Sequence, residues 1–172
     1  MKHTLSVLVE NRPGVLSKVA GLFSRRSFNI DSLAVGVTED TTISRITIVV
    51  NGDDYTIEQV EKQLNKLIDV IKVKTLTPGE FISRELTLFK VHANASNRSE
   101  IVQIADLFGA KIVDVARDTL TLEFSDTNER TEDLENMLKP YGIREVVRTG
   151  TIALDRGGKL IGADGREKKA EE

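Results

Sequence analysis

The sequence predicts an α+β protein built from two tandem ferredoxin-like domains. Each domain has the order strand, helix, strand, strand, helix, strand, with both helices on one face of an antiparallel sheet. Two observations predict this class. Segments of alternating apolar residues and segments of helical spacing follow one another in this βαββαβ order, and the order occurs twice within the 172 residues. In addition, Thr77-Pro78-Gly79 stands between the two halves and has the composition of a linker.

The first strand and the first helix are predicted from a change of period at a turn. Leu5, Val7 and Val9 alternate with less apolar neighbours, which predicts a strand with one buried face. Beyond Asn11–Gly14 the apolar residues recur at helical spacing and predict a helix over about 13 to 25. Pro13 suits the first turn of such a helix, because the N–H that proline lacks has no partner within the helix there.

The rest of the first half is predicted to form a hairpin, a second helix and a closing strand. A polar turn, 38–42, joins the two hairpin strands. Glu58 precedes Lys62 by four residues, which favours an ion pair on the helix surface. In chain order the predicted elements cover 28–37, 43–50, 57–67 and 70–76.

The second half repeats the order of elements without obvious sequence similarity to the first. Asn97 and Glu100 have the spacing of a capping box at the start of its first helix. The predicted elements cover 86–93, 98–108, 111–117, 119–124, 129–139 and, as one last strand, 143–154.

These elements define the expected domain boundaries. The N-terminal domain covers 1–77, a linker covers 78–83, and the C-terminal domain covers 84–158. The last segment, 159–172, is rich in glycine and charge, so we expect a flexible tail that cannot bury enough apolar surface to offset its ordering entropy.

Composition excludes several classes of function. The net charge of -3 disfavours a nucleic-acid partner, which needs a basic surface. The chain has no cysteine and only His3 and His92, which argues against a metal centre and against cysteine nucleophiles. No apolar run approaches the roughly 18 residues that span a bilayer, so we expect no membrane span and a cytoplasmic protein. Glycine-rich phosphate loops, serine elbows and paired carboxylates are missing too, so no catalytic machinery is visible.

The candidate binding site is the turn between the first strand and the first helix. The free N–H groups at a helix N-terminus favour a carboxylate or phosphate, and Gly14 lets a ligand approach the backbone. Asn29, at the entry to the second strand, is expected near Asn11, so that two amides and the helix N-terminus bind both ends of an α-amino acid. The plainer alternative is that Asn11 only caps the helix and Asn29 is an ordinary turn residue.

The same residues carry a family resemblance. The segments Asn11–Leu16, Gly21–Phe23 and Phe28–Leu33 resemble an ACT domain, the amino-acid-sensing module of metabolic enzymes. Together with Leu5–Asn11, Ser44–Ile48, Glu61–Leu67 and Arg148–Gly150, they resemble the family of small regulatory subunits of acetolactate synthase, over about residues 2 to 158.

The resemblance implies a function without catalysis. Members of this family activate a large catalytic subunit and confer feedback inhibition by valine or another branched-chain amino acid in branched-chain amino acid biosynthesis. Thiamine diphosphate, Mg²⁺ and FAD would belong to the catalytic partner, and none is expected here. The resemblance also implies a homodimer through the ACT domains. Effector contacts carried over from the family fall on Asn11, Gly14, Val15, Leu16, Asn29 and Ile30.

Three alternatives stand beside this interpretation. An RNA-binding domain of the same element order needs aromatic residues on its central strands, and the first domain has none there. A small acylphosphatase-like enzyme needs a glycine-rich phosphate loop, which is missing. The serious alternative is a free-standing ACT-type amino-acid sensor that acts on another partner.

Overall fold

The computed structural model describes residues 1–161 and divides the chain into two compact units. The first unit contains Met1–Ile82 together with the described residues from Ile152 on, and the second contains Ser83–Thr151. The predicted C-terminal domain extended to 158. The structure instead groups the segment after Thr151 with the first unit, for reasons given below.

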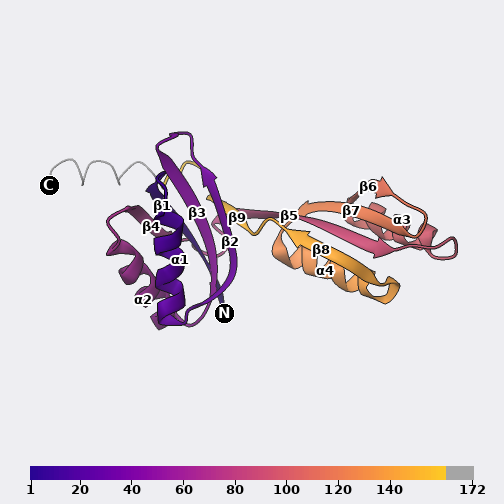
Figure 1. Ribbon diagram of the computed structural model, residues 1–172, viewed down its shortest axis with the longest axis horizontal. Coiled ribbons are helices and arrows are strands. Elements are labelled where there is room, and N and C mark those ends of the chain that lie inside the picture. The colour runs from indigo at the N-terminus through magenta and orange to yellow at the C-terminus, as the bar shows by residue number, and fades with distance from the viewer. Residues whose placement is uncertain (162–172) are drawn as a thin grey trace. The chain divides into compact units, whose positions relative to one another are not determined.

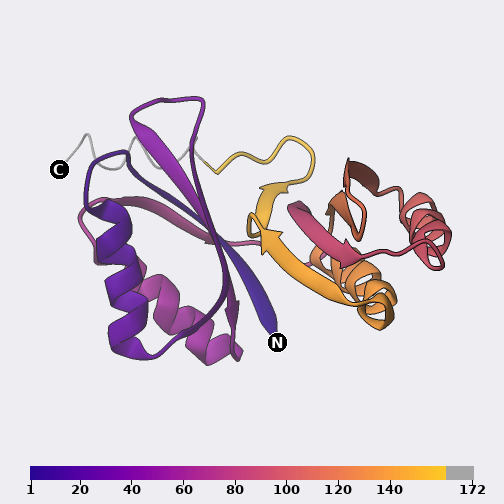
Figure 2. The same ribbon diagram turned by 45° about the vertical axis from the view of Figure 1, so that its right-hand side comes forward.

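The first unit has the predicted βαββαβ order (Figure 1). Its antiparallel sheet has the strand order β2-β3-β1-β4, and Figures 1 and 2 show both helices on the same face of it. The fold class is therefore confirmed for this half. The elements are β1 (Lys2–Glu10), α1 (Val15–Arg26), β2 (Asn29–Val37), β3 (Ile43–Asn51), α2 (Asp54–Asn65) and β4 (Val70–Thr75).

The core of the first unit lies between the sheet and its helices. Leu5 and Val7 of β1 are fully buried there against α1 and α2, as their alternation predicts. The predicted surface pair on α2 is also present, with Lys62 Nζ 2.7 Å from Glu58 Oε1.

The opposite face of this sheet is not open to solvent, which differs from the one-face-buried strand that the sequence predicts. Ser6 and Leu8, which alternate with the core residues of β1, are both buried, and so is Thr47 on β3. Because the strand register places these residues on the face away from the helices, another segment of the chain must cover them.

That segment is the end of the described chain, Ile152–Ile161. The side chain of Ile161 is only 6% exposed and packs in a small apolar cluster with Leu8 and Ile43. Two ion pairs hold the same segment: Lys74 Nζ lies 2.6 Å from Asp155 Oδ2, and Lys159 Nζ lies 2.7 Å from Glu80 Oε2. The expected flexible tail is therefore wrong for 159–161, which are anchored; the rest of it, 162–172, lies outside the described residues.

Substitution of Ile161 tests this cover. Ile161→Ala should lower the free energy of unfolding by about 2 kcal/mol, because it removes buried methylene groups and leaves a gap over Leu8 and Ile43. The neighbouring Leu160 is 73% exposed, so Leu160→Ala is the matched control and should change stability by less than about 0.5 kcal/mol. Urea unfolding measures both, and equal midpoints for the two variants would contradict the packing of Ile161.

The second unit repeats the architecture. Its main sheet has the strand order β6-β7-β5-β8, and its core residues face α3 and α4, with Phe89 and Leu122 fully buried. The fold class is confirmed for this half as well. The elements are β5 (Phe81–His92), α3 (Arg98–Phe108), β6 (Lys111–Val115), β7 (Thr119–Asp126), α4 (Asn128–Leu138), a 3-10 turn (Lys139–Tyr141) and β8 (Ile143–Arg148). The last strand, β9 (Ile152–Asp155), belongs to the segment that groups with the first unit, and it pairs with β5, which begins in that unit.

Three local predictions for the second half are wrong. The linker was expected through 83, but β5 already begins at Phe81. The single last strand is two strands, because Gly150 adopts a positive φ of 87° that interrupts the extended chain. Asn97 does not cap α3 with its side chain; its Oδ1 accepts from the N–H of Asn94, whose own side chain orders the turn.

No helix among residues 1–161 combines the length and the apolar character that crossing a bilayer requires.

Candidate functional site

The start of α1 is an open helix N-terminus. The helix begins at Val15, and its N-cap is Gly14, whose φ of 85° lies in the left-handed region that glycine tolerates best. The predicted start at 13 is therefore two residues early, and Pro13 lies in the turn before the helix. No side chain caps α1, whereas Asp53 caps α2 and accepts from the N–H of Thr56.

This open terminus leaves donors free for a ligand. The main-chain N–H groups of Gly14, Leu16 and Ser17 have no acceptor among the described residues. Val15 N has only a long hydrogen bond of 3.4 Å to the carbonyl of Arg12. Together with the positive end of the helix dipole, these groups suit a carboxylate.

Asn11 is held beside the open terminus by the turn of the hairpin. Its Nδ2 donates to the carbonyl of Thr41 at 2.9 Å, and its main-chain N–H donates to the carbonyl of Thr42 at 2.8 Å. The alternative in which Asn11 caps the helix is therefore wrong. Because Nδ2 is used, the side-chain orientation is fixed, and Oδ1 accepts no hydrogen bond from any described residue.

The apolar residues carried over from the family differ in their exposure. Leu16 is 43% exposed and adjoins the free N–H groups, so it is available to a ligand. Val15 is only 4% exposed and belongs to the core, so it can offer a ligand its main chain but not its side chain. Ile30 is half-buried at the margin of the same core.

Asn29 lies at the other end of the sheet. It is the first residue of β2 and pairs with Asn51, which in turn pairs with Lys2 at the start of β1. Asn11 follows the last residue of β1, so the nine residues of that strand separate the two asparagines by about 30 Å at the usual rise. The prediction that one chain brings Asn11 and Asn29 together is therefore wrong. Helix α1 runs antiparallel to β1 and returns the chain to the opposite end of the sheet, where β2 begins.

The turn is also attached to the loop before β4 through Asp69. The side chain of this residue is only 7% exposed, with Oδ1 2.6 Å from Arg12 Nη2 and Oδ2 2.8 Å from Lys18 Nζ. Its carbonyl accepts from the N–H of Glu10 at 2.9 Å. The hydrogen bond from Lys18, with a smaller contribution from Arg12, holds the pKa of the Asp69 carboxyl below its ordinary value, so the group is ionised at neutral pH.

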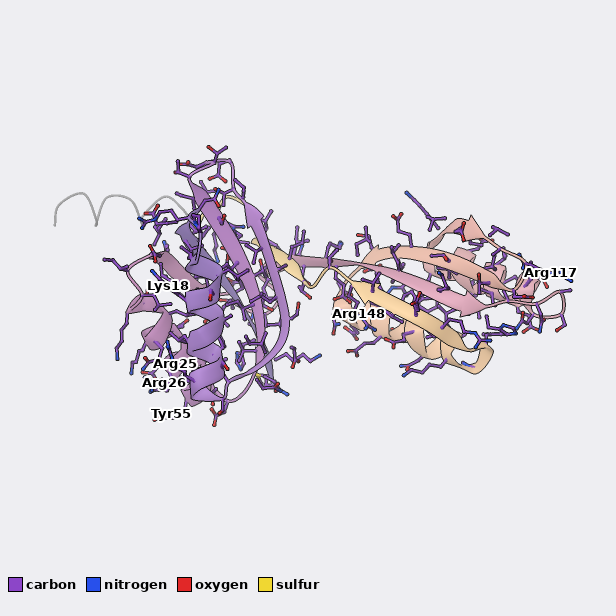
Figure 3. All side chains as sticks on the ribbon, viewed as in Figure 1. Lys18, Arg25, Arg26, Tyr55, Arg117 and Arg148 are labelled. Atoms are coloured by element: carbon purple, nitrogen blue, oxygen red, sulfur yellow. The ribbon has the colours of Figure 1, made fainter. Side chains whose placement is uncertain are left out.

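Sequence reasoning missed the two supports of the turn, Thr41 and Asp69. Both are distant in sequence from Asn11–Leu16, and neither occupies a recognisable motif, so no local signal marks them. Lys18 was also missed as a partner of the site; it lies near the start of α1, whereas Arg25 and Arg26 lie towards its end (Figure 3).

Beside the turn, the sheet ends in an apolar edge. β2 is the edge strand of its sheet, and its free side pairs with no described strand. Val35 and Val37 near its end are exposed, although the register places them on the side of the sheet that carries the helices.

No group of three His, Cys, Asp or Glu residues within 1–161 is arranged to hold a metal ion.

These features define a class of protein: one that carries an ACT domain, with a candidate ligand site at the open start of its first helix. The sequence model for the AHAS (acetohydroxyacid synthase) small subunit-like ACT domain matches residues 5–72. A second model, described as the small subunit of acetolactate synthase, matches residues 84–157. The chain therefore belongs to the family of acetolactate synthase small subunits, as its sequence resemblance predicts.

Individual relatives support the same family. The acetolactate synthase small subunit of Mycolicibacterium smegmatis is 53% identical over 161 residues, which cover 94% of this chain and 95% of that protein. A probable acetolactate synthase small subunit of Archaeoglobus fulgidus is 52% identical, over 92% of this chain and 99% of that protein. The crystal structure of the small subunit from Thermotoga maritima superposes with a TM-score of 0.85 at 41% identity, and covers 92% of this chain and 99% of that one. Membership of this family gives the chain a regulatory role and implies a large catalytic subunit as its partner.

Proposed function

We propose that the Asn11–Leu16 turn binds valine or a related branched-chain amino acid, and that binding reduces the activation that this subunit gives to its catalytic partner. The observation that carries the proposal is the uncapped start of α1, where the N–H groups of Gly14, Leu16 and Ser17 have no acceptor among the described residues.

Each part of such an amino acid has a matching group. The free N–H groups bind the carboxylate, and Oδ1 of Asn11 accepts from the ammonium. The exposed side chain of Leu16 packs on the branched side chain, whose burial is worth about 1.5 to 3 kcal/mol. One methylene changes binding by only about 1 to 3 kcal/mol, so discrimination between valine and leucine should be modest.

Asn29 joins this site if two copies of the chain associate. Pairing of two β2 edges about a two-fold axis is antiparallel, so it places the start of one β2 beside the end of the other. The end of β2 lies at the same end of the sheet as the effector turn, with β3 between them, so Asn29 and Ile30 of one copy are then brought to the end of the partner's sheet that carries Asn11 and Leu16. The exposed apolar edge of β2 supports this homodimer.

The subunit itself contributes no catalytic group in this proposal. Acetolactate formation takes place on the large subunit, which would carry the thiamine diphosphate, the Mg²⁺ and the FAD. Inhibition then requires that valine favour the arrangement of ACT domains that activates less, since equal affinity for both arrangements shifts nothing. The cytoplasmic location expected from the sequence stays a prediction.

Acetolactate formation from pyruvate by the catalytic subunit tests the proposal. The rate should rise when this protein is added, and a valine titration should reverse the rise. The free-standing sensor predicts a different result: valine binds in calorimetry, but the rate does not respond to the protein. Absence of binding by valine, leucine and isoleucine would contradict both readings.

A further inference from the structure

The Asn11–Leu16 turn is tied to the rest of its unit from two sides. On one side the hairpin turn holds Asn11 through the carbonyls of Thr41 and Thr42. On the other side the buried carboxylate of Asp69 receives both cations of the turn and first helical turns, Arg12 and Lys18. The N–H groups that we assign to the effector lie between these two attachments.

The second attachment is a two-sided bridge through one buried carboxylate. Each carboxylate oxygen of Asp69 faces a different cation, Arg12 on Oδ1 and Lys18 on Oδ2, so the carboxylate bridges the loop residue to the helix. The burial of the Asp69 carboxylate limits the screening of its charge. The main-chain carbonyl of Asp69 also accepts a hydrogen bond from the N–H of Glu10 at the end of β1. The side chains of Arg12 and Lys18 are otherwise largely exposed, so Asp69 is what fixes them.

We propose that Asp69 is a positioning residue for the effector site: by holding Arg12 and Lys18 it fixes the turn in the geometry that directs the free N–H groups of Gly14, Leu16 and Ser17 at the effector carboxylate. This inference rests on the proposed function. Asp69 is too deep to touch the effector in this role, and Arg12 is engaged by Asp69 and not by the ligand.

A purely electrostatic role and a positioning role of Asp69 predict opposite changes in valine affinity when its charge is removed. Asp69→Asn keeps the size of the side chain but removes a negative charge near the bound carboxylate. If Asp69 acted only through its field, valine would bind the variant more tightly. If Asp69 positions the turn, loss of the two-sided bridge should weaken valine binding about tenfold.

Calorimetry with valine on the full chain measures the effect, and circular dichroism verifies that each variant is folded. A Kd for Asp69→Asn that equals or falls below the wild-type value would overturn the proposal. Where Asp69→Asn does not fold, Lys18→Gln decides, because it removes one arm of the bridge at an exposed residue. Lys62→Gln is the matched control, since it removes an exposed lysine whose only ion-pair partner within residues 1–161 is Glu58 on α2, and it should leave the Kd unchanged.

Measurements at high ionic strength distinguish positioning by Lys18 from a direct electrostatic attraction between Lys18 and the effector carboxylate. At 1 M salt the Debye length is about 3 Å, so a through-space effect of this charge on the effector should vanish, whereas loss of positioning should persist. Adding Lys18→Gln to Asp69→Asn should give little further loss, since both changes break the same bridge. Full additivity of the two changes would show that Lys18 and Asp69 act separately and would overturn the bridge.

Amide hydrogen exchange measured without effector tests this inference independently of the proposed function. The amides of Asn11 and Lys18 donate to the carbonyls of Thr42 and Gly14, and these bonds depend on the geometry of the turn. Both amides should exchange faster with solvent deuterium in Asp69→Asn than in the wild type, with amides of the β1 core unchanged. Unchanged exchange at both amides would overturn the inference. If wild-type protein binds none of the three branched-chain amino acids, the proposed function fails, whatever the exchange shows.

Discussion

Gly14→Asp should raise the Kd for valine at least about 100-fold and abolish inhibition of acetolactate formation. The added carboxylate would stand at the helix start where the effector carboxylate binds, and two like charges about 4 Å apart repel by about 4 kcal/mol at the effective dielectric of a protein surface. A Cβ at this position meets no described atom within 4 Å, so the side chain has room, and its cost to the fold is the strain of a φ of 85°.

The matched control is Gly14→Asn. Both variants place a branched γ-carbon at a φ of 85° and share the same left-handed strain, which asparagine tolerates comparatively well. The difference between their Kd values therefore isolates the charge. Activation by the two variants should stay near that of the wild type, because the site is assigned to inhibition only. Valine binding to Gly14→Asp with wild-type affinity would refute the placement of the effector.

Asn11→Ala and Asn29→Ala should each remove inhibition when present alone, yet a mixture of the two chains should recover part of it. Each substitution deletes one hydrogen bond to the charged ammonium, worth about 1.5 to 3 kcal/mol, or about 10- to 100-fold in Kd. In a mixed dimer one site contains both substitutions, whereas the other combines the intact Asn11 of one chain with the intact Asn29 of the other. With random pairing about one quarter of all sites are intact.

Co-expression of the two variants with separate affinity tags, followed by purification of the mixed dimer, makes the measurement direct. The mixed dimer should bind one valine per dimer with nearly wild-type affinity, and each homodimeric variant should bind weakly. A mixed dimer that binds no better than its parents would show that Asn11 and Asn29 do not share a site across the interface. If Asn29→Ala abolished activation in an assembled complex while leaving valine binding intact, the separation of activation from inhibition would be wrong.

Helix and strand positions were predictable because they depend on local periodicity. The stripe that includes Val19 and Leu22 fixes α1, and the alternation of Leu5, Val7 and Val9 fixes β1, wherever the rest of the chain lies. The caps were less predictable. Gly14 and not a polar side chain begins α1, and Asn94 and not Asn97 orders the start of α3, because several residues near a helix start can compete for the same donors.

Long-range attachments were not predictable. Asp69 has no pattern of its own, yet folding brings it to Arg12, 57 residues away in sequence, and to Lys18, 51 residues away. Ile161 stands in a glycine-rich and charged segment that reads as a tail, and it is buried because Leu8 and Ile43 leave an apolar surface on the outer sheet face. A single apolar residue carries no periodicity, so its burial depends entirely on what surrounds it.

The sequence by itself determined the two βαββαβ units, the family and the turn at Asn11–Leu16, since these depend on local spacing and on residues that are contiguous in the chain. Only the tertiary structure decided which groups of that turn are free, that Val15 faces the core, and that Asn11 and Asn29 lie at opposite ends of one sheet. The physical reason is that strand direction and register, which no single segment encodes, set the distance between residues of different strands.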